Sequence, residues 1–399
     1  MMPIISRRTA LLGLSGAIAV RGASLAVAAA PTDRRFVVVI LRGAMDGLSA
    51  VVPYGDPGLM ALRPALVPPQ PGQDKGLLDL GGMFGLHPAL SRSHARYQAN
   101  ELLIVHAVAG PYRARSHFEA QDYLESGADH RMTSGWLNRV VAALNVSSSG
   151  QAHAIAIGGP VPLLLRGGPG ASKDVANWAP HGFAEPQPAL YQAILSLNQN
   201  DKVTGPAIVA GLRDRGFGHK VLGESEKDKA RFGFPALARA AGAMLRAPDG
   251  PRIAAMELGG WDTHTAQIDR MVGPLTQLDA GLDALRDGLG EAWKQTAVLA
   301  MTEFGRTARM NGTQGTDHGT ATVAFLAGGA VAGGRVIANW PGLGRGQLLE
   351  DRDLAPTTDL RSVARGILGA HLGLAPTALT AVFPGSEGAQ TLRNLVRTG

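Results

Sequence analysis

Cysteine is absent from this chain of 399 residues. Its absence excludes disulfide bonds, thiolate nucleophiles and thiolate-bound metals, so any metal site must use oxygen and imidazole ligands. Aromatic residues make up only 5% of the sequence, and basic residues form no cluster interleaved with aromatic ones. The sequence therefore indicates no nucleic acid among the partners of this protein.

Long apolar runs are also absent, because no stretch reaches the roughly 20 residues that a membrane-spanning helix needs. The weakly apolar stretch that ends at Ala30 is interrupted by Arg21 and follows Arg7 and Arg8. Paired arginines before such a stretch, with small residues at its end, resemble a twin-arginine export signal with a cleavage site. We therefore expect residues 1–30 to engage the twin-arginine export machinery. The mature protein would then be periplasmic or secreted, with no permanent membrane span.

The remaining composition is that of an ordinary globular protein. The net charge is +6, but the three arginines of residues 1–30 supply half of it, and 45% of all residues are hydrophobic. We predict one domain over residues 31–399. The charged segment 201–232 indicates a solvated helical insertion or a lid, with a plain exposed helix face as the simpler interpretation. Residues 52–85 are rich in proline and glycine and predict a surface excursion without recognisable chemistry.

The most informative stretch runs from Arg252 to Gly319. It predicts an apolar strand over 252–258, an amphipathic helix from Ile268 to Leu289 and a second apolar strand over 297–302. A strand, a crossover helix and a strand of this length form a parallel βαβ unit, in which both strands end at one edge of the sheet. Further buried strands are expected at 35–41 and 101–108. The sequence therefore predicts an α/β protein with a mainly parallel central sheet.

Acidic and histidine residues follow the ends of several of these expected strands. Because ligands of open α/β sheets bind at the carboxyl ends of the strands, we expect these side chains to converge. Carboxylates with imidazoles suit one or two divalent metal ions such as Zn, Mn or Mg. The predicted metal ligands are Asp46, Asp262, His264, Glu303, Asp317 and His318.

Ser116 and Glu119 form the S-x-x-E pattern of a capping box at a helix start. In that interpretation Ser116 is only a cap. The same position would place its hydroxyl beside free N–H groups and the positive end of the helix dipole, which bind anions such as phosphate or sulfate. Ser116 is therefore also a candidate nucleophile, and we add His117 and Arg306 to the candidate catalytic residues.

Most of these residues also have a structural interpretation when they are taken singly. Asp262 could cap the following helix, Glu303 could pair with Arg306, and Asp317 could close a turn between glycines. The case for a functional site depends on several loops that present acids and histidines at the same edge of the sheet.

Six motifs together resemble the bacterial exported family called domain of unknown function 1501. They occur in order over nearly the whole expected mature chain. They are Leu41-Arg-Gly-Ala-Met-Asp-Gly47, Ser116-His-Phe-Glu-Ala-Gln-Asp122, Gly259-Gly-Trp-Asp-Thr-His264, Thr302-Glu-Phe-Gly-Arg306, Gly315-Thr-Asp-His-Gly319 and Pro356-Thr-Thr-Asp359.

This resemblance implies an alkaline phosphatase-like or sulfatase-like fold, a three-layer α/β/α arrangement with a two-metal site at the strand ends. It implies that Asp46 is the metal ligand after the first strand and Ser116 the nucleophile. It further implies that Asp262, His264 and His318 bind metal. Where many enzymes of that superfamily have Asp-His, this chain has Glu303-Phe304, which removes one imidazole.

Two functions follow as hypotheses. The first is an exported metal-dependent hydrolase of phosphate or sulfate esters, whose substrate is an anionic small molecule or polymer. The alternative is a non-catalytic exported binding or cell-surface protein that retains the fold.

Overall fold

The computed structural model describes residues 33–144, 153–167, 175–180, 188–198, 201, 204–222 and 233–397. The expected export signal at residues 1–30 lies outside these ranges. Among the described helices, none has both the length and the apolar character needed to cross a membrane.

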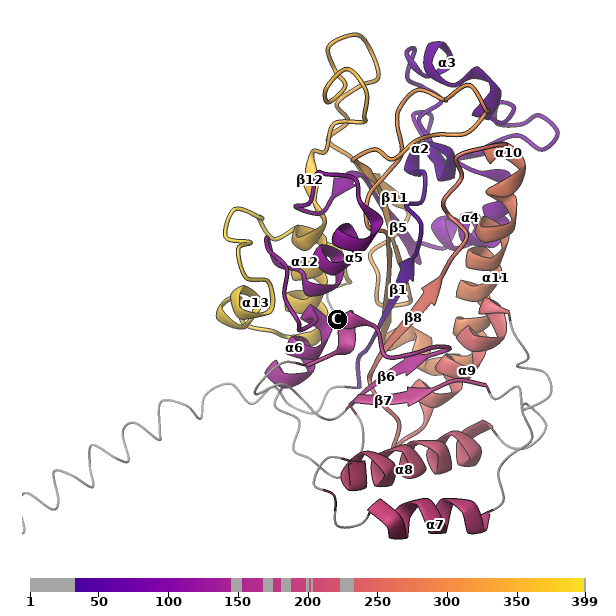
Figure 1. Cartoon of the computed structure of the whole chain (residues 1–399). Coiled ribbons are helices and arrows are strands. Elements are labelled where there is room, and N and C mark those ends of the chain that lie inside the picture. The colour runs from indigo at the N-terminus through magenta and orange to yellow at the C-terminus, as the bar shows by residue number, and fades with distance from the viewer. Residues whose placement is uncertain are drawn as a thin grey trace, which may run out of the picture.

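A large, mainly parallel sheet forms the centre of the molecule (Figure 1). Its strand order is β11-β5-β10-β9-β1-β8-β6-β7, with β12 paired to β5. Strand β10 is antiparallel to both of its neighbours, and the other pairings are parallel. The strands are β1 (Arg35–Leu41), β5 (Leu102–Ala109), β6 (Ala154–Ile157), β7 (Val175–Trp178), β8 (Ile253–Leu258), β9 (Thr296–Met301), β10 (Thr322–Ala327), β11 (Arg335–Ile337) and β12 (Thr358–Asp359).

Helices cover both faces of this sheet. Strand β1 is fully buried, and its alternate residues enter two different cores: Val37 and Val39 pack on one side, Phe36 and Val38 on the other. One layer contains α4 (Ser91–Gln98), α9 (Phe234–Arg246), α10 (Gln267–Arg270) and α11 (Val272–Leu289). The other contains α5 (His117–Ser126), α6 (Trp136–Ala143), α12 (Leu360–Leu372) and α13 (Pro376–Val382) (Figure 1). The predicted three-layer α/β/α architecture is confirmed.

The predicted strand, helix and strand of residues 252–319 are present as β8, α10 with α11, and β9. Strand β1 lies between β8 and β9 and is parallel to both, so all three end at the same edge. The helix is interrupted at Met271, because Pro274 has no N–H to donate to the carbonyl of Arg270. The edge that carries the candidate site is thus formed by three neighbouring parallel strands.

Residues 52–85 are more deeply embedded than their composition predicts. Arg63 within this segment is 0% exposed, and Leu59 and Leu66 are buried. The expectation of a surface excursion is therefore wrong for its middle part, where apolar residues fold inward between the proline and glycine turns. The elements of this segment and its flanks are α2 (Gly47–Ala50), β2 (Val51–Val52), α3 (Leu59–Leu62), the 3₁₀ helix η1 (Pro64–Leu66), β3 (Leu78–Asp79) and β4 (Gly85–Leu86).

Helix α8 (Thr204–Leu222) occupies much of the segment 201–232 for which a helical insertion is expected. It contacts β7 and α9 and lies beside α7 (Pro188–Asn198). Residues 223–232 lie outside the described ranges, and the role of this segment as a lid stays a prediction. Short 3₁₀ helices complete the fold at η2 (Pro88–Leu90), η3 (Leu163–Leu165) and η4 (Gly290–Gln295).

Three buried histidines away from the strand ends make the stability of the fold pH-dependent. Burial lowers the pKa of His87, His106 and His371 to about 4, against 6.5 when exposed. In His106, Nε2 donates to the carbonyl of Val51 and Nδ1 accepts from its neighbour's N–H, so a second proton would break the latter bond.

We expect these histidines to stabilise the protein fully above pH 6.5 and to lose that contribution as the pH falls toward 4. The reason is that the unfolded chain takes up these protons at a higher pH than the folded chain does. The midpoint of urea unfolding should therefore fall steadily over this range. His371→Gln, which retains a donor for the Arg35 carbonyl, should flatten part of the decline. Equal midpoints at both ends of the range would contradict the prediction.

Candidate metal centre

Two segments that follow β9 are held against each other at the carboxyl edge of the sheet. Arg306 and His318 form an antiparallel bridge, and the N–H of Gly319 donates to the carbonyl of Gly305 at 2.8 Å. A Cβ added to Gly305 would lie 1.9 Å from the Ala321 carbonyl oxygen, so only glycine permits this approach. The bridge places His318 beside the end of β9.

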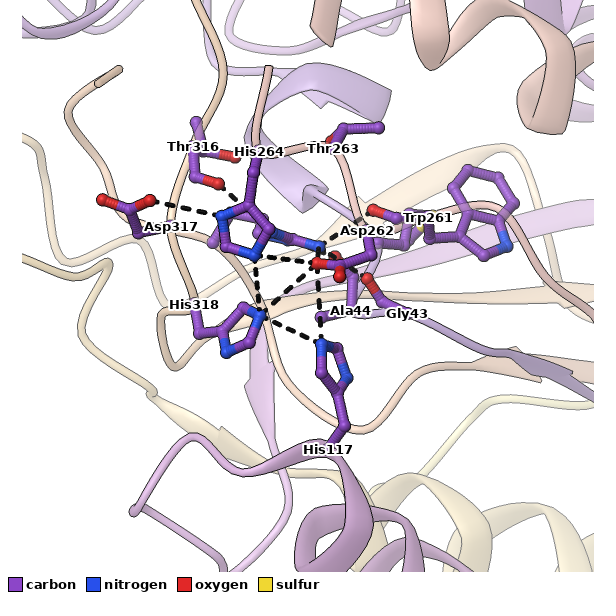
Figure 2. A network of polar contacts seen from close by, with 12 residues as sticks. Gly43, Ala44, His117, Trp261, Asp262, Thr263, His264, Thr316, Asp317 and His318 are labelled. Atoms are coloured by element: carbon purple, nitrogen blue, oxygen red, sulfur yellow. Dashed lines mark hydrogen bonds and ion pairs between the residues drawn. The ribbon is translucent and has the colours of Figure 1, made fainter. Parts of the chain in front are cut away.

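Four side-chain atoms converge there from the loop after β8, the start of α5 and the loop before β10, as Figure 2 shows. The Nε2 atom of His318 lies 3.0 Å from Nε2 of His117 and 3.0 Å from Nε2 of His264. Asp262 Oδ1 lies 3.0 Å from Nε2 of His264, 3.4 Å from that of His318 and 3.6 Å from that of His117. The side chains of Asp262 and His264 are 49% and 41% exposed, so the cluster is open to solvent.

Each of the three imidazoles is oriented through its other nitrogen. His117 Nδ1 contacts Glu303 Oε1 at 2.8 Å, and His264 Nδ1 contacts Asp317 Oδ1 at 3.3 Å. His318 Nδ1 contacts the carbonyl of Arg115 at 3.0 Å. Because carboxylates and carbonyls only accept hydrogen bonds, a neutral His117 or His318 ring in these contacts carries its proton on Nδ1 and directs the lone pair of Nε2 into the cluster. His264 has a carboxylate at each nitrogen, since Asp262 Oδ1 lies 3.0 Å from Nε2 and Asp317 Oδ1 lies 3.3 Å from Nδ1, so these contacts do not select one tautomer.

Lone pairs that face each other at 3.0 Å repel unless a cation or a shared proton lies between them. Ligands bound tetrahedrally at about 2 Å from a zinc ion would be about 3.3 Å apart, which agrees with the separations of 3.0–3.6 Å found here. His117, Asp262 and His318 form a group whose potential ligand atoms all lie within 4.8 Å of one another. His264 lies outside that group, although its Nε2 is 3.0 Å from both His318 Nε2 and Asp262 Oδ1. The three residues of the group fit one divalent metal ion.

The acids around the cluster are held in their charged forms. Burial acts to raise the pKa of Asp262, but the hydrogen bond and charge of Arg306 outweigh it and lower the pKa. Burial likewise acts to raise the pKa of Glu303, but hydrogen bonds from His117 and other neighbours outweigh it and lower the pKa. Glu303 raises the pKa of His117, whereas burial lowers that of His318.

Arg306 connects the loops around the cluster and is buried. Its Nε donates to the carbonyl of Ala44 at 2.8 Å and its Nη1 to that of Thr316 at 3.1 Å. Its Nη2 donates to the carbonyls of Gly43 and Trp261 and to Asp262 Oδ1, the last at 2.5 Å. These contacts hold the loops in place around the cluster, and the expected catalytic role of Arg306 stays a prediction.

Not every predicted site residue enters the cluster. Glu303 and Asp317, expected as metal ligands, contact the outer nitrogens of His117 and His264. Asp46 caps α2 and accepts a hydrogen bond from buried Arg63 at 2.6 Å. Their roles as ligands stay predictions. His117 contributes one of the converging nitrogens, and its expected role in catalysis stays a prediction.

Ser116 is the N-cap residue of α5, but its side chain makes no hydrogen bond to the helix backbone. The predicted capping box is wrong, because Glu119 accepts a hydrogen bond from the hydroxyl of Tyr112 at 2.5 Å and does not reach back to residue 116. Ser116 directly precedes His117, at the edge of the cluster. Its role as nucleophile stays a prediction.

Sequence reasoning missed two residues that organise the site. Arg63 is a lone charge within the apolar run 59–66, which was the one available signal of a buried ion pair. Arg115 has a left-handed backbone (φ 61°) and a guanidinium bound to buried Asp353 at 2.8 Å, and its carbonyl orients His318. No sequence pattern reveals this use of a backbone carbonyl.

The fold and the cluster together define a three-layer α/β protein with a histidine and aspartate centre at the carboxyl edge of its sheet. The chain belongs to the family described as protein of unknown function (DUF1501), whose model matches residues 100–383. The family expected from the six motifs is thus confirmed. A search of curated proteins found no match.

Several solved structures are similar to this chain at low identity. One is the C-terminal periplasmic domain of EcEptC from Escherichia coli in complex with Zn, at 9% identity, 74% coverage of this chain, 73% of that chain and TM-score 0.37. The phosphonate monoester hydrolase of Agrobacterium radiobacter is 12% identical, with 86% of this chain and 74% of that chain covered and a TM-score of 0.37. A protein in the alkaline phosphatase superfamily from Vibrio parahaemolyticus is 10% identical, with 79% of this chain and 64% of that chain covered and a TM-score of 0.31. These TM-scores are too low to carry an argument about function.

Proposed function

We propose that this protein is an exported metal-dependent hydrolase of phosphate or sulfate esters. The observation that supports it best is the set of three imidazole Nε2 atoms that converge beside Asp262 Oδ1. A bound divalent ion would polarise an ester oxygen and lower the pKa of a bound water. Export outside the cytoplasm by the twin-arginine route rests on the paired arginines of residues 1–30.

The residues of this chain have distinct parts in the proposal. His117, His264, His318 and Asp262 hold the ion. Glu303, Asp317 and the Arg115 carbonyl fix the outer nitrogens of the three rings, an arrangement that keeps metal-binding imidazoles in the correct tautomer.

Anion binding would come from the start of α5. The free N–H groups of its first turn and its dipole favour negative charge next to the cluster. Ser116 lies at this point, and its hydroxyl is not used in capping, so we propose it as the nucleophile. The substrate would be an ester whose phosphoryl or sulfuryl group lies between the helix start and the ion.

The proposal is tested with the purified full chain loaded with Zn, Mn or Mg and assayed with p-nitrophenyl phosphate and p-nitrophenyl sulfate. We expect turnover of at least one ester, its loss in His264→Ala, and its loss without loss of metal in Ser116→Ala. His130→Ala is the matched control, because His130 is 61% exposed and contacts only Asp129 in the described interactions. Stoichiometric metal without turnover of either ester would instead favour the non-catalytic binding protein.

A further inference from the structure

We infer that the centre takes one metal ion and that Asp46 is a positioning residue, neutralised by Arg63 in place of a second ion. The inference rests on the proposed metal centre and concerns its stoichiometry. It disagrees with the two-metal site that the family resemblance implies.

Both oxygens of Asp46 are already occupied. Oδ1 accepts from the N–H of Leu48 at 3.1 Å. Oδ2 accepts from Ser49 Oγ at 2.8 Å, Arg63 Nη1 at 2.6 Å and Gln267 Nε2 at 2.5 Å. The carboxylate is 1% exposed. A metal ion could bind here only by displacing the guanidinium of Arg63 and by remaining close to its positive charge.

Arg63 cannot turn away to admit such an ion. Its Nε donates to the carbonyl of Ala308 at 2.9 Å and its Nη2 to that of Thr307 at 2.5 Å. These two carbonyls and Asp46 together hold the planar guanidinium from three directions, and its side chain is 1% exposed. The positive charge at Asp46 is therefore a fixed part of the fold.

The Asp46 and Arg63 pair is linked to the metal centre through Gln267. The amide nitrogen of Gln267 donates to Asp46, and its oxygen accepts from Thr263 Oγ1 at 2.9 Å and Thr316 Oγ1 at 2.6 Å. Thr263 lies between Asp262 and His264 in the chain, and Thr316 lies two residues before His318. One buried amide therefore fixes the spacing of the two loops that supply three of the four converging atoms.

No other carboxylate in the described ranges completes a second centre. The acids and histidines there form one group close enough to share an ion, and it contains His117, Asp262 and His318. Glu303 and Asp317 are occupied behind the imidazoles.

The test is the number of Zn²⁺ ions bound per full chain at saturation, measured by equilibrium dialysis and elemental analysis. We expect one ion in the wild type. Asp46→Asn leaves Arg63 buried without its counter-charge, so that variant alone could fail to fold. The double variant Asp46→Asn/Arg63→Gln removes both charges and should melt at a higher temperature than the single one. It should still bind one ion, with affinity reduced about 10–100-fold as the loops loosen.

Asp56→Asn is the matched control. Asp56 is also a buried carboxylate, which accepts from Gly58, Trp340 and Leu343 and has no link to Gln267 among the described interactions. Its replacement should lower the melting temperature and leave zinc affinity unchanged. Two ions in the wild type with one lost in the double variant would overturn this inference and leave the hydrolase proposal intact. No bound ion in the wild type would overturn both.

Discussion

Arg306→Ala is expected to lower the free energy of unfolding by about 4 kcal/mol or more. The replacement would leave the carbonyls of Gly43, Ala44, Trp261 and Thr316 without their donors in a buried space. Each unsatisfied buried acceptor costs about 1–3 kcal/mol. The loops after β1 and β8 and the segment before β10 would also lose their common contact. Urea unfolding followed by circular dichroism measures the change.

Arg309→Ala is the control for this substitution. Arg309 lies three residues along the same segment, is exposed, and donates to the carbonyl of Ala61 at 3.2 Å. Surface replacements of this kind change stability by about 0.5 kcal/mol or less. If Arg306→Ala were as stable as Arg309→Ala, the role of Arg306 as the connection between the loops would be wrong.

His318→Ala is expected to weaken zinc binding by more than about 100-fold, because loss of a residue that only orients a ligand already costs about 10–100-fold. His318 is the central member of the cluster, since its Nε2 lies 3.0 Å from those of both His117 and His264. Its loss removes one ligand atom and the contact between the other two rings. Competition with a chromogenic zinc chelator measures the affinity.

The matched control is His130→Ala, which removes an exposed imidazole paired with Asp129 and should leave the affinity unchanged. Circular dichroism of both variants would show whether the fold is retained. A folded His318→Ala variant that binds zinc within tenfold of the wild type would remove His318 from the centre.

Periodicity was sufficient to predict the elements that carry the site. The strand at 35–41 has the predicted bounds, and the βαβ unit ends where the apolar runs end, because burial on both faces demands continuous apolar residues. The placement of Asp262, His264 and Glu303 at one edge followed from the parallel topology, whereas His318 lies in the loop that leads into the antiparallel strand β10. Strand direction fixes the edge at which a residue lies, and that information is present in the sequence.

The division of tasks within the site was not predictable. Glu303 and Asp262 both follow strand ends, yet one faces the outer nitrogen of His117 and the other faces the cluster. That difference depends on the direction of side chains within irregular loops, and the spacing of apolar residues in the sequence does not predict that direction. The pairing of Asp46 with Arg63 joins a strand end to a segment that composition marks as a loop. Such contacts are decided by packing in three dimensions.

The most direct test of the central claim is anomalous X-ray diffraction at the zinc absorption edge from crystals of the full chain grown with zinc. The account predicts one strong peak at about 2 Å from the Nε2 atoms of His117, His264 and His318, and none beside Asp46. If zinc-soaked crystals instead showed no peak at the cluster, the facing imidazoles would have to share a proton. The assignment of a metal centre would then be contradicted.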